Sequence, residues 1–116
     1  MKISEFVNNF NLHDSYIESV EYNKEKREVQ LIVHFAFWMQ KDYIEGTPET
    51  GLIKVLFQNV NKYSCDNGDP TGSFVGILRS EIRDDNFVLK LLDDETVECF
   101  EMVIISDEVI VNTINE

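Results

Sequence analysis

The sequence contains few cysteine and glycine residues. Its two cysteines, Cys65 and Cys99, are too few for a disulfide framework and too far apart for a CxxC metal or redox motif. We expect Cys99, inside an apolar segment, to be a small core residue. The five glycines follow neither the GxGxxG nor the GxxxxGK(S/T) order, which argues against dinucleotide and P-loop sites.

Long apolar runs are also missing. No segment approaches the ~18 uncharged apolar residues of a membrane span. The first ten residues contain Glu5 and two asparagines where a signal peptide would carry an apolar run. We therefore expect a soluble cytoplasmic protein.

Basic residues are outnumbered by acidic ones, 10 against 22, which gives a formal net charge of -12. Such a charge repels nucleic-acid phosphates and anionic lipid headgroups, so neither is an expected partner. Ten acidic residues and one basic residue, Lys90, lie between Asp84 and the end. This acidic third is either a solubilising surface or a surface that attracts a basic protein. Its candidate residues are Asp84, Asp85, Asp93, Asp94 and Glu95.

The apolar residues predict one domain, residues 1–116, of the α+β class. Ile3, Phe6, Val7 and Phe10 have the spacing of one helical stripe. Alternating patterns predict a mostly antiparallel sheet or small sandwich of about seven strands. The expected strands are 16–22, 28–39, 52–60, 74–82, 87–92, 97–105 and 109–114.

The segment from Glu28 to Met39 is apolar on both alternating faces, so we expect a central strand covered on both sides. His34 on this strand would then be a core histidine with a hydrogen-bond partner. In the first strand, Val20 and Tyr22 should face opposite to Ile17. A change of apolar parity after Cys99 suggests a bulge in strand 97–105, and residues 40–51 and 61–73 read as loops.

His13, Asp14 and Ser15 are adjacent and contain the residue types of a catalytic triad. Triad members normally come from distant segments, so anchoring of a turn by side-chain hydrogen bonds is the favoured interpretation. A metal site from His13, Asp14 and His34 is an alternative, although no HxH, HxxxH or HExxH spacing supports it. We therefore predict no cofactor and no metal.

Two loop regions contain further candidates. Asp66 to Asp69 contains oxygen ligands around a glycine but lacks the EF-hand register, so a turn is favoured over a calcium site. Trp38, Tyr43 and Tyr63 are candidates to line a small apolar pocket, although core packing is the favoured interpretation.

Residues 12–17 (LHDSYI), followed by a charged hairpin loop and an apolar strand ending near Trp38, resemble a set of small bacterial proteins of unknown function. Some members of such sets are immunity proteins encoded beside polymorphic toxins. The resemblance covers the first third of the chain. It implies a cytoplasmic, non-enzymatic α+β protein that binds a toxin or another protein. The acidic charge of the chain would suit a basic toxin as that partner.

The main functional hypothesis is therefore a protein-binding module of immunity-protein type. The alternative is a small-ligand or metal-dependent enzyme using His13, Asp14 and His34. Candidate binding residues under either hypothesis are His13, Asp14, Ser15, His34 and Trp38. A homo-oligomer formed through an exposed sheet edge is a third hypothesis.

Overall fold

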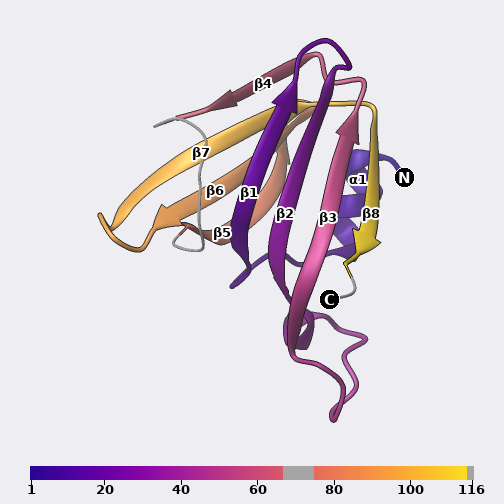
Figure 1. Cartoon of the computed structure of the whole chain (residues 1–116), viewed down its shortest axis with the longest axis vertical. Coiled ribbons are helices and arrows are strands. Elements are labelled where there is room, and N and C mark those ends of the chain that lie inside the picture. Colours follow the sequence, from indigo (N-terminus) through magenta and orange to yellow (C-terminus); the bar gives the residue numbers. More distant parts are fainter. Residues whose placement is uncertain (67–74, 115–116) are drawn as a thin grey trace.

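The chain forms one antiparallel sheet and one short N-terminal helix (Figure 1). The computed structural model describes residues 1–66 and 75–114, and within these ranges it has eight strands where the sequence predicted about seven. The elements are α1 (Ile3–Asn9), β1 (Tyr16–Asn23), β2 (Glu28–Ala36), the 3₁₀ turn η1 (Phe37–Met39), β3 (Thr50–Gln58), β4 (Lys62–Cys65), β5 (Val75–Arg83), β6 (Asn86–Asp93), β7 (Glu98–Ile105) and β8 (Glu108–Thr113). The α+β class and the antiparallel pairing are confirmed.

The additional strand is β4, which lies in the segment predicted as a loop. Tyr63 and Ser64 pair with Ile104 and Val103 of β7, and β4 forms one edge of the sheet. The strand order is β4-β7-β6-β5-β1-β2-β3-β8. The rest of the predicted loop, residues 67–73, lies outside the described residues.

The predicted central strand is interior in the sheet but covered on one face only. β2 pairs with β1 and β3, and its buried residues alternate as Val29, Leu31, Val33 and Phe35. Ile32 and His34, on the opposite face, are half-exposed. The strand ends at Ala36, where the chain enters η1. The prediction of cover on both sides was therefore wrong, as was that of a buried His34.

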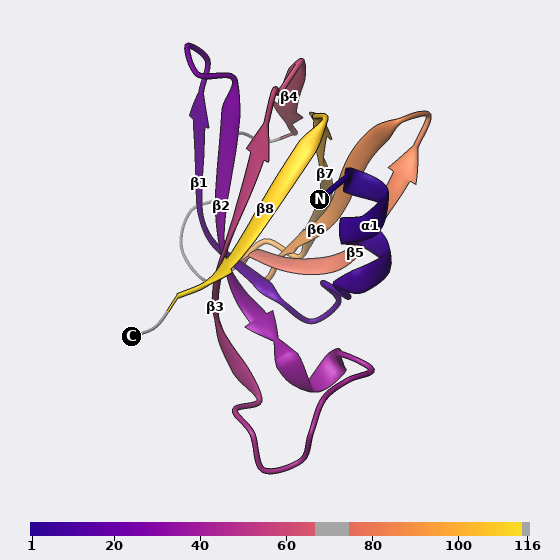
Figure 2. The ribbon, with the colours of Figure 1, turned by 90° about the vertical axis from the view of Figure 1, so that its right-hand side faces the viewer.

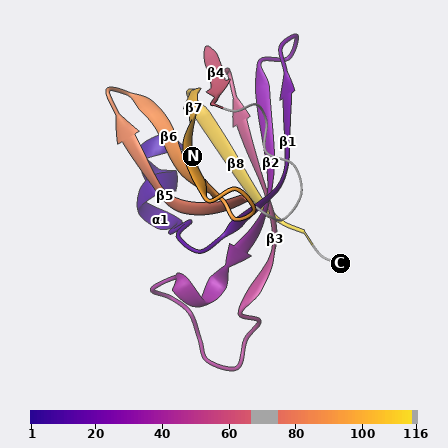
Figure 3. The ribbon, with the colours of Figure 1, turned by 90° about the vertical axis from the view of Figure 1, so that its left-hand side faces the viewer.

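The sheet bends into two halves that face each other. The strands β8, β3, β2 and β1 form one half and β5, β6, β7 and β4 the other, and Figures 2 and 3 show the halves diverging. Among the described residues, β1 and β5 join them through two paired positions, Tyr16 with Gly76 and Ile17 with Val75. The core lies between the halves, because the ring centres of Phe57 on β3 and Phe87 on β6 are 5.3 Å apart.

Helix α1 covers this core with the stripe predicted from the sequence. Phe6 is fully buried, and its ring centre lies 6.1 Å from that of Phe57 and 5.7 Å from that of Phe87. A seven-residue helix is too short to be stable alone, so this packing must stabilise it. No helix in the described ranges is long and apolar enough to cross a membrane.

A bulge in β1 changes the predicted faces of that strand. The register shifts between Ile17 and Ser19. Because an extra residue reverses the alternation, Ile17, Val20 and Tyr22 all pack on the core. The predicted opposite orientation of Ile17 was wrong.

No such shift occurs in β7, where a bulge was predicted. Its pairing with β6 runs without interruption from Glu98 to Ile104. Phe100 and Met102 point into the core, whereas Cys99 is exposed. The predicted core position of Cys99 was wrong, because the alternation of a regular strand places it on the outer face.

Candidate functional site

Residues 13–15 form the turn before β1, and this turn makes hydrogen bonds to strands of both halves of the sheet. Asp14 adopts a left-handed backbone (φ 64°), and its N–H donates to the carbonyl of Ile77 at 3.2 Å. Ser15 is fully buried, and its Oγ accepts a hydrogen bond from the Ala36 N–H at 3.0 Å. The hydroxyl of Ser15 thus satisfies a buried backbone donor and does not face solvent.

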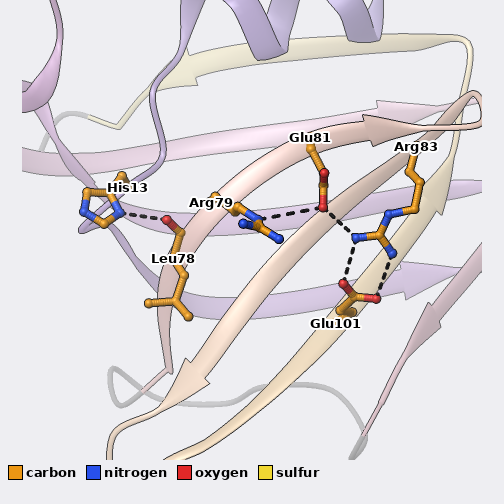
Figure 4. A network of polar contacts seen from close by, with 6 residues as sticks. All are labelled: His13, Leu78, Arg79, Glu81, Arg83 and Glu101. Carbon is orange, nitrogen blue, oxygen red and sulfur yellow. Dashed lines mark hydrogen bonds and ion pairs between the residues drawn. The ribbon is translucent and has the colours of Figure 1, made fainter.

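His13, the first residue of this turn, is exposed. Its Nδ1–H donates to the carbonyl of Leu78 at 2.7 Å (Figure 4). Its Nε2 lies 3.5 Å from Asp14 Oδ1. The Leu78 carbonyl lies where the register of β5 shifts, between Ile77 and Arg79. The imidazole therefore caps a backbone acceptor at a strand irregularity.

His34 has a different partner. Its Nε2–H donates to Glu18 Oε2 at 2.5 Å on the outer face of β1 and β2. The bulge in β1 includes Glu18, and the pairing of His34 with Tyr16 places both side chains at the same end of the hairpin. His13 and His34 thus bond to separate groups. Among the described residues, no three His, Cys, Asp or Glu side chains are grouped to hold a metal ion.

The five acidic residues predicted as a partner surface form two groups. Asp84 and Asp85 form the β5–β6 turn with positive φ at both positions, whereas Asp93 ends β6 and Asp94 and Glu95 begin the β6–β7 turn. The eight-residue strand β6 separates the two turns, which places them more than about 20 Å apart. The structure therefore divides the predicted acidic partner surface into two separate clusters at opposite ends of β6.

Between these turns the outer face of β5 and β7 holds a charged network (Figure 4). Arg83 donates to both carboxylate oxygens of Glu101, at 3.2 and 3.0 Å, and to Glu81 at 2.6 Å. The hydrogen bond from Arg83 lowers the pKa of Glu101 below its usual value, and the two carboxylates raise that of the guanidinium. Asp66, from the candidate calcium segment, accepts from the Glu101 N–H at 3.3 Å, and the rest of that segment is outside the described residues.

Two exposed apolar side chains lie in the segment that follows β2. Residues 37–49 project beyond the sheet as one long loop (Figures 1 and 2). Trp38 is 45% exposed and Ile44 is 69% exposed. The loop also carries three carboxylates, Asp42, Glu45 and Glu49, against one lysine. We call residues 37–49 the projecting loop.

Hydrogen bonds fix the projecting loop to the rest of the chain. The Gln40 side chain accepts from the Asn11 N–H at 2.9 Å and donates to the carbonyls of Asn11 and Ala36 at 2.8 and 2.9 Å. Within the loop, the Trp38 N–H donates to the carbonyl of Glu49 at 3.1 Å and so joins the two ends of the loop. These contacts define the shape of the loop before any partner binds.

Two adjoining hollows, each of about 440 Å³, lie where the projecting loop meets the ends of β3 and β8. They share Phe37, Pro48 and Thr113. The first, which we call the loop hollow, is also lined by Gln40, Asp42, Tyr43, Ile44 and Thr47. The second is also lined by His34, Thr50, Gly51, Leu52 and Ile114.

The structure brings only part of the predicted binding set to this region. His34 lines the second hollow and Trp38 lies on the projecting loop, while His13 to Ser15 belong to the turn before β1. Tyr43 lines the loop hollow as considered from the sequence, whereas Tyr63 packs against Tyr22 at a ring distance of 5.0 Å. Sequence reasoning missed Ile44, Pro48 and Thr113. An isoleucine within a polar, Gly- and Pro-containing loop was the available signal for the first of these.

The edges of the sheet are β4 and β8. Met1 covers part of the β8 edge, because its amino group donates to the Val109 carbonyl at 2.9 Å and its carbonyl accepts from the Val109 N–H at 2.9 Å. Homo-oligomerisation through an edge stays a prediction.

Comparisons with protein-family models, with curated proteins and with solved structures found no match to this chain.

Proposed function

We propose that the protein is a non-enzymatic binding module that captures a basic protein, in the manner of an immunity protein that captures a toxin. The observation that carries the proposal is the projecting loop, which exposes Trp38 and Ile44 in a chain of net charge -12. Exposed apolar groups rimmed by polar ones are typical of protein interaction sites. The surrounding carboxylates would attract a basic surface and repel an acidic one.

The candidate chemical groups support binding more than catalysis. Ser15 Oγ accepts the Ala36 N–H, and the Nδ1–H of His13 donates to a backbone carbonyl. A nucleophile must reach its substrate and a base must reach that nucleophile. The hypothesis of an enzyme using His13, Asp14 and His34 therefore has less support than the binding hypothesis.

The test begins with affinity capture from the native host, followed by purification of the captured protein and calorimetry with the two pure components. We expect a basic protein that binds at one-to-one stoichiometry and more weakly as salt rises, because exposed charges are screened. For the immunity function, co-expression should restore growth to cells that produce the partner.

The matched variants are Ile44→Asp on the projecting loop and Ile82→Asp on β5, since Ile82 is also exposed, at 43%. The loop variant should weaken binding by at least about tenfold, as expected when an apolar contact is replaced by a charge. The β5 variant should bind like the wild type. Failure of the wild type to bind any basic protein would contradict the proposal.

A further inference from the structure

The loop hollow has the composition of a site for an apolar side chain. Its lining includes Phe37, Tyr43, Ile44 and Pro48. A volume of about 440 Å³ lies within the range of about 300–1,000 Å³ that is usual for sites that enclose a ligand group. Aromatic and aliphatic groups would leave water on entering such a lining, which favours binding.

One of the residues that line the loop hollow is charged. Asp42 lines the loop hollow, and Glu45 and Glu49 belong to the same projecting loop. A carboxylate beside an apolar hollow favours a cation held next to an apolar group and disfavours an anion there. The negative charge of the loop therefore favours an apolar group whose neighbour is basic over one whose neighbour is acidic.

The shape of the hollow is set by the fold. Gly51 of β3 has no side chain, and a Cβ at this position would lie 2.7 Å from Cε2 of Phe37. The Phe37 ring can therefore lie directly against the strand, where it lines both hollows. The Tyr43 hydroxyl donates to the Thr47 carbonyl at 3.1 Å and holds the tyrosine across the loop. A site formed in advance loses less conformational freedom when it binds.

We propose that the loop hollow receives one apolar side chain of the partner, aromatic or long aliphatic, whose neighbouring residue is basic and pairs with Asp42. The inference rests on the proposed function and names its anchoring contact. Energetically dominant contacts of protein interfaces are usually such central apolar side chains in pockets. The basic neighbour then makes the hollow selective for its partner.

The test uses three capped dipeptide amides as probes, acetyl-Phe-Arg, acetyl-Phe-Gln and acetyl-Gly-Arg, titrated into the full chain and followed by amide NMR shifts. We expect acetyl-Phe-Arg to shift the signals of Tyr43, Ile44 and Thr113. Acetyl-Phe-Gln should bind about two- to five-fold more weakly, the effect of one exposed ion pair. Acetyl-Gly-Arg should not shift these signals.

Two variants separate the apolar and charged contributions. Asp42→Asn should remove the preference for acetyl-Phe-Arg over acetyl-Phe-Gln, and Ile44→Asp should abolish binding of both, while the Ile82→Asp control binds like the wild type. Shifts at other residues, or a preference that survives Asp42→Asn, would overturn the inference.

The outcome is distinguishable from failure of the proposed function. If the captured partner still binds the Ile44→Asp variant at wild-type strength, the anchoring role of the hollow is wrong while the capture function stands. If no basic partner exists but the dipeptides bind as expected, the hollow has the proposed selectivity and the capture function is wrong.

Discussion

At the scale of single residues, several polar side chains near the predicted site have structural partners. Ser15 is the clearest case, because its hydroxyl is buried and bonded to the backbone of β2. The sequence presented it as a possible nucleophile beside His13 and Asp14. Its distant partner, Ala36, was not apparent from the sequence, because the two residues meet only after the hairpin forms.

Replacing Ser15 by alanine should destabilise the protein by about 1–3 kcal/mol, since the buried Ala36 N–H would lose its acceptor. Urea unfolding measures the change in free energy. The control is Ser19→Ala on β1, the strand that follows Ser15, where the side chain is exposed and the effect should stay within about 0.5 kcal/mol. Equal stability of the two variants would show that water replaces the hydroxyl.

Val97 occupies an unfavourable backbone conformation in the β6–β7 turn. Its φ is 59°, although branched residues rarely adopt the left-handed region, and its side chain is 75% exposed. Asparagine tolerates this region, so Val97→Asn should raise the free energy of unfolding by about 1 kcal/mol. Thr96→Asn is the matched control, because Thr96 has no positive φ. Thermal unfolding of both variants tests this, and a gain confined to Thr96→Asn would contradict it.

At the scale of elements, ion pairs between strands on the outer face make a contribution to stability that depends on pH. The Arg83 side chain of β5 holds the pKa of Glu101 on β7 below its usual value. A lowered carboxyl pKa stabilises the fold above the unfolded-state pKa, and this contribution is lost as the pH falls through the folded-state pKa. The stabilisation by Arg83 should therefore be present at neutral pH and disappear in acid.

The Arg83→Gln variant tests this sign. NMR titration of the Glu101 carboxyl should show its pKa rising toward the ordinary value of 4.5. The stability difference between wild type and variant should close as the pH falls through the lowered pKa of Glu101, because that carboxyl is then protonated and no longer pairs with Arg83. Arg79→Gln serves as the comparison, since its nearest contact with Glu81 is longer, at 3.8 Å. A difference that widens in acid would contradict the assignment.

The start of β3 and the turn η1 depend on each other. A methyl group at Gly51 would overlap the Phe37 ring, so Gly51→Ala should cost about 1–3 kcal/mol and alter the fluorescence of nearby Trp38. In the Phe37→Leu background the same substitution should cost less, because the overlapping ring is gone. A double-mutant cycle on unfolding free energies measures this coupling. Additive effects would mean that the ring and the strand are independent.

At the scale of the whole molecule, the core has to hold together two half-sheets that share a short seam. β1 and β5 pair at two positions, and Phe6 of α1 contacts Phe57 of one half and Phe87 of the other. The helix thus stabilises the closed arrangement of the halves.

Phe6→Ala should therefore destabilise the protein by about 3–5 kcal/mol, the usual cost of removing a buried phenylalanine. Calorimetry together with circular dichroism would measure it. Val7→Ala, on the same helix but only partly buried, should cost less. If Phe6→Ala were no more damaging than Val7→Ala, the helix would not be what closes the core.

The sequence by itself determined the local elements. Alternation identified seven of the eight strands, and helical spacing identified α1. These features depend on neighbours within a few positions, where the period of the backbone decides which side chains share a face.

The tertiary structure alone decided which distant residues meet. It paired the polar segment 62–65 with β7, turned Ile17 inward through a bulge, and separated the acidic turns to opposite ends of β6. It also placed the projecting loop beside Thr113 to form the loop hollow. Such contacts depend on the bend and register of the whole sheet, which are set by long-range packing and leave no periodic trace in the sequence.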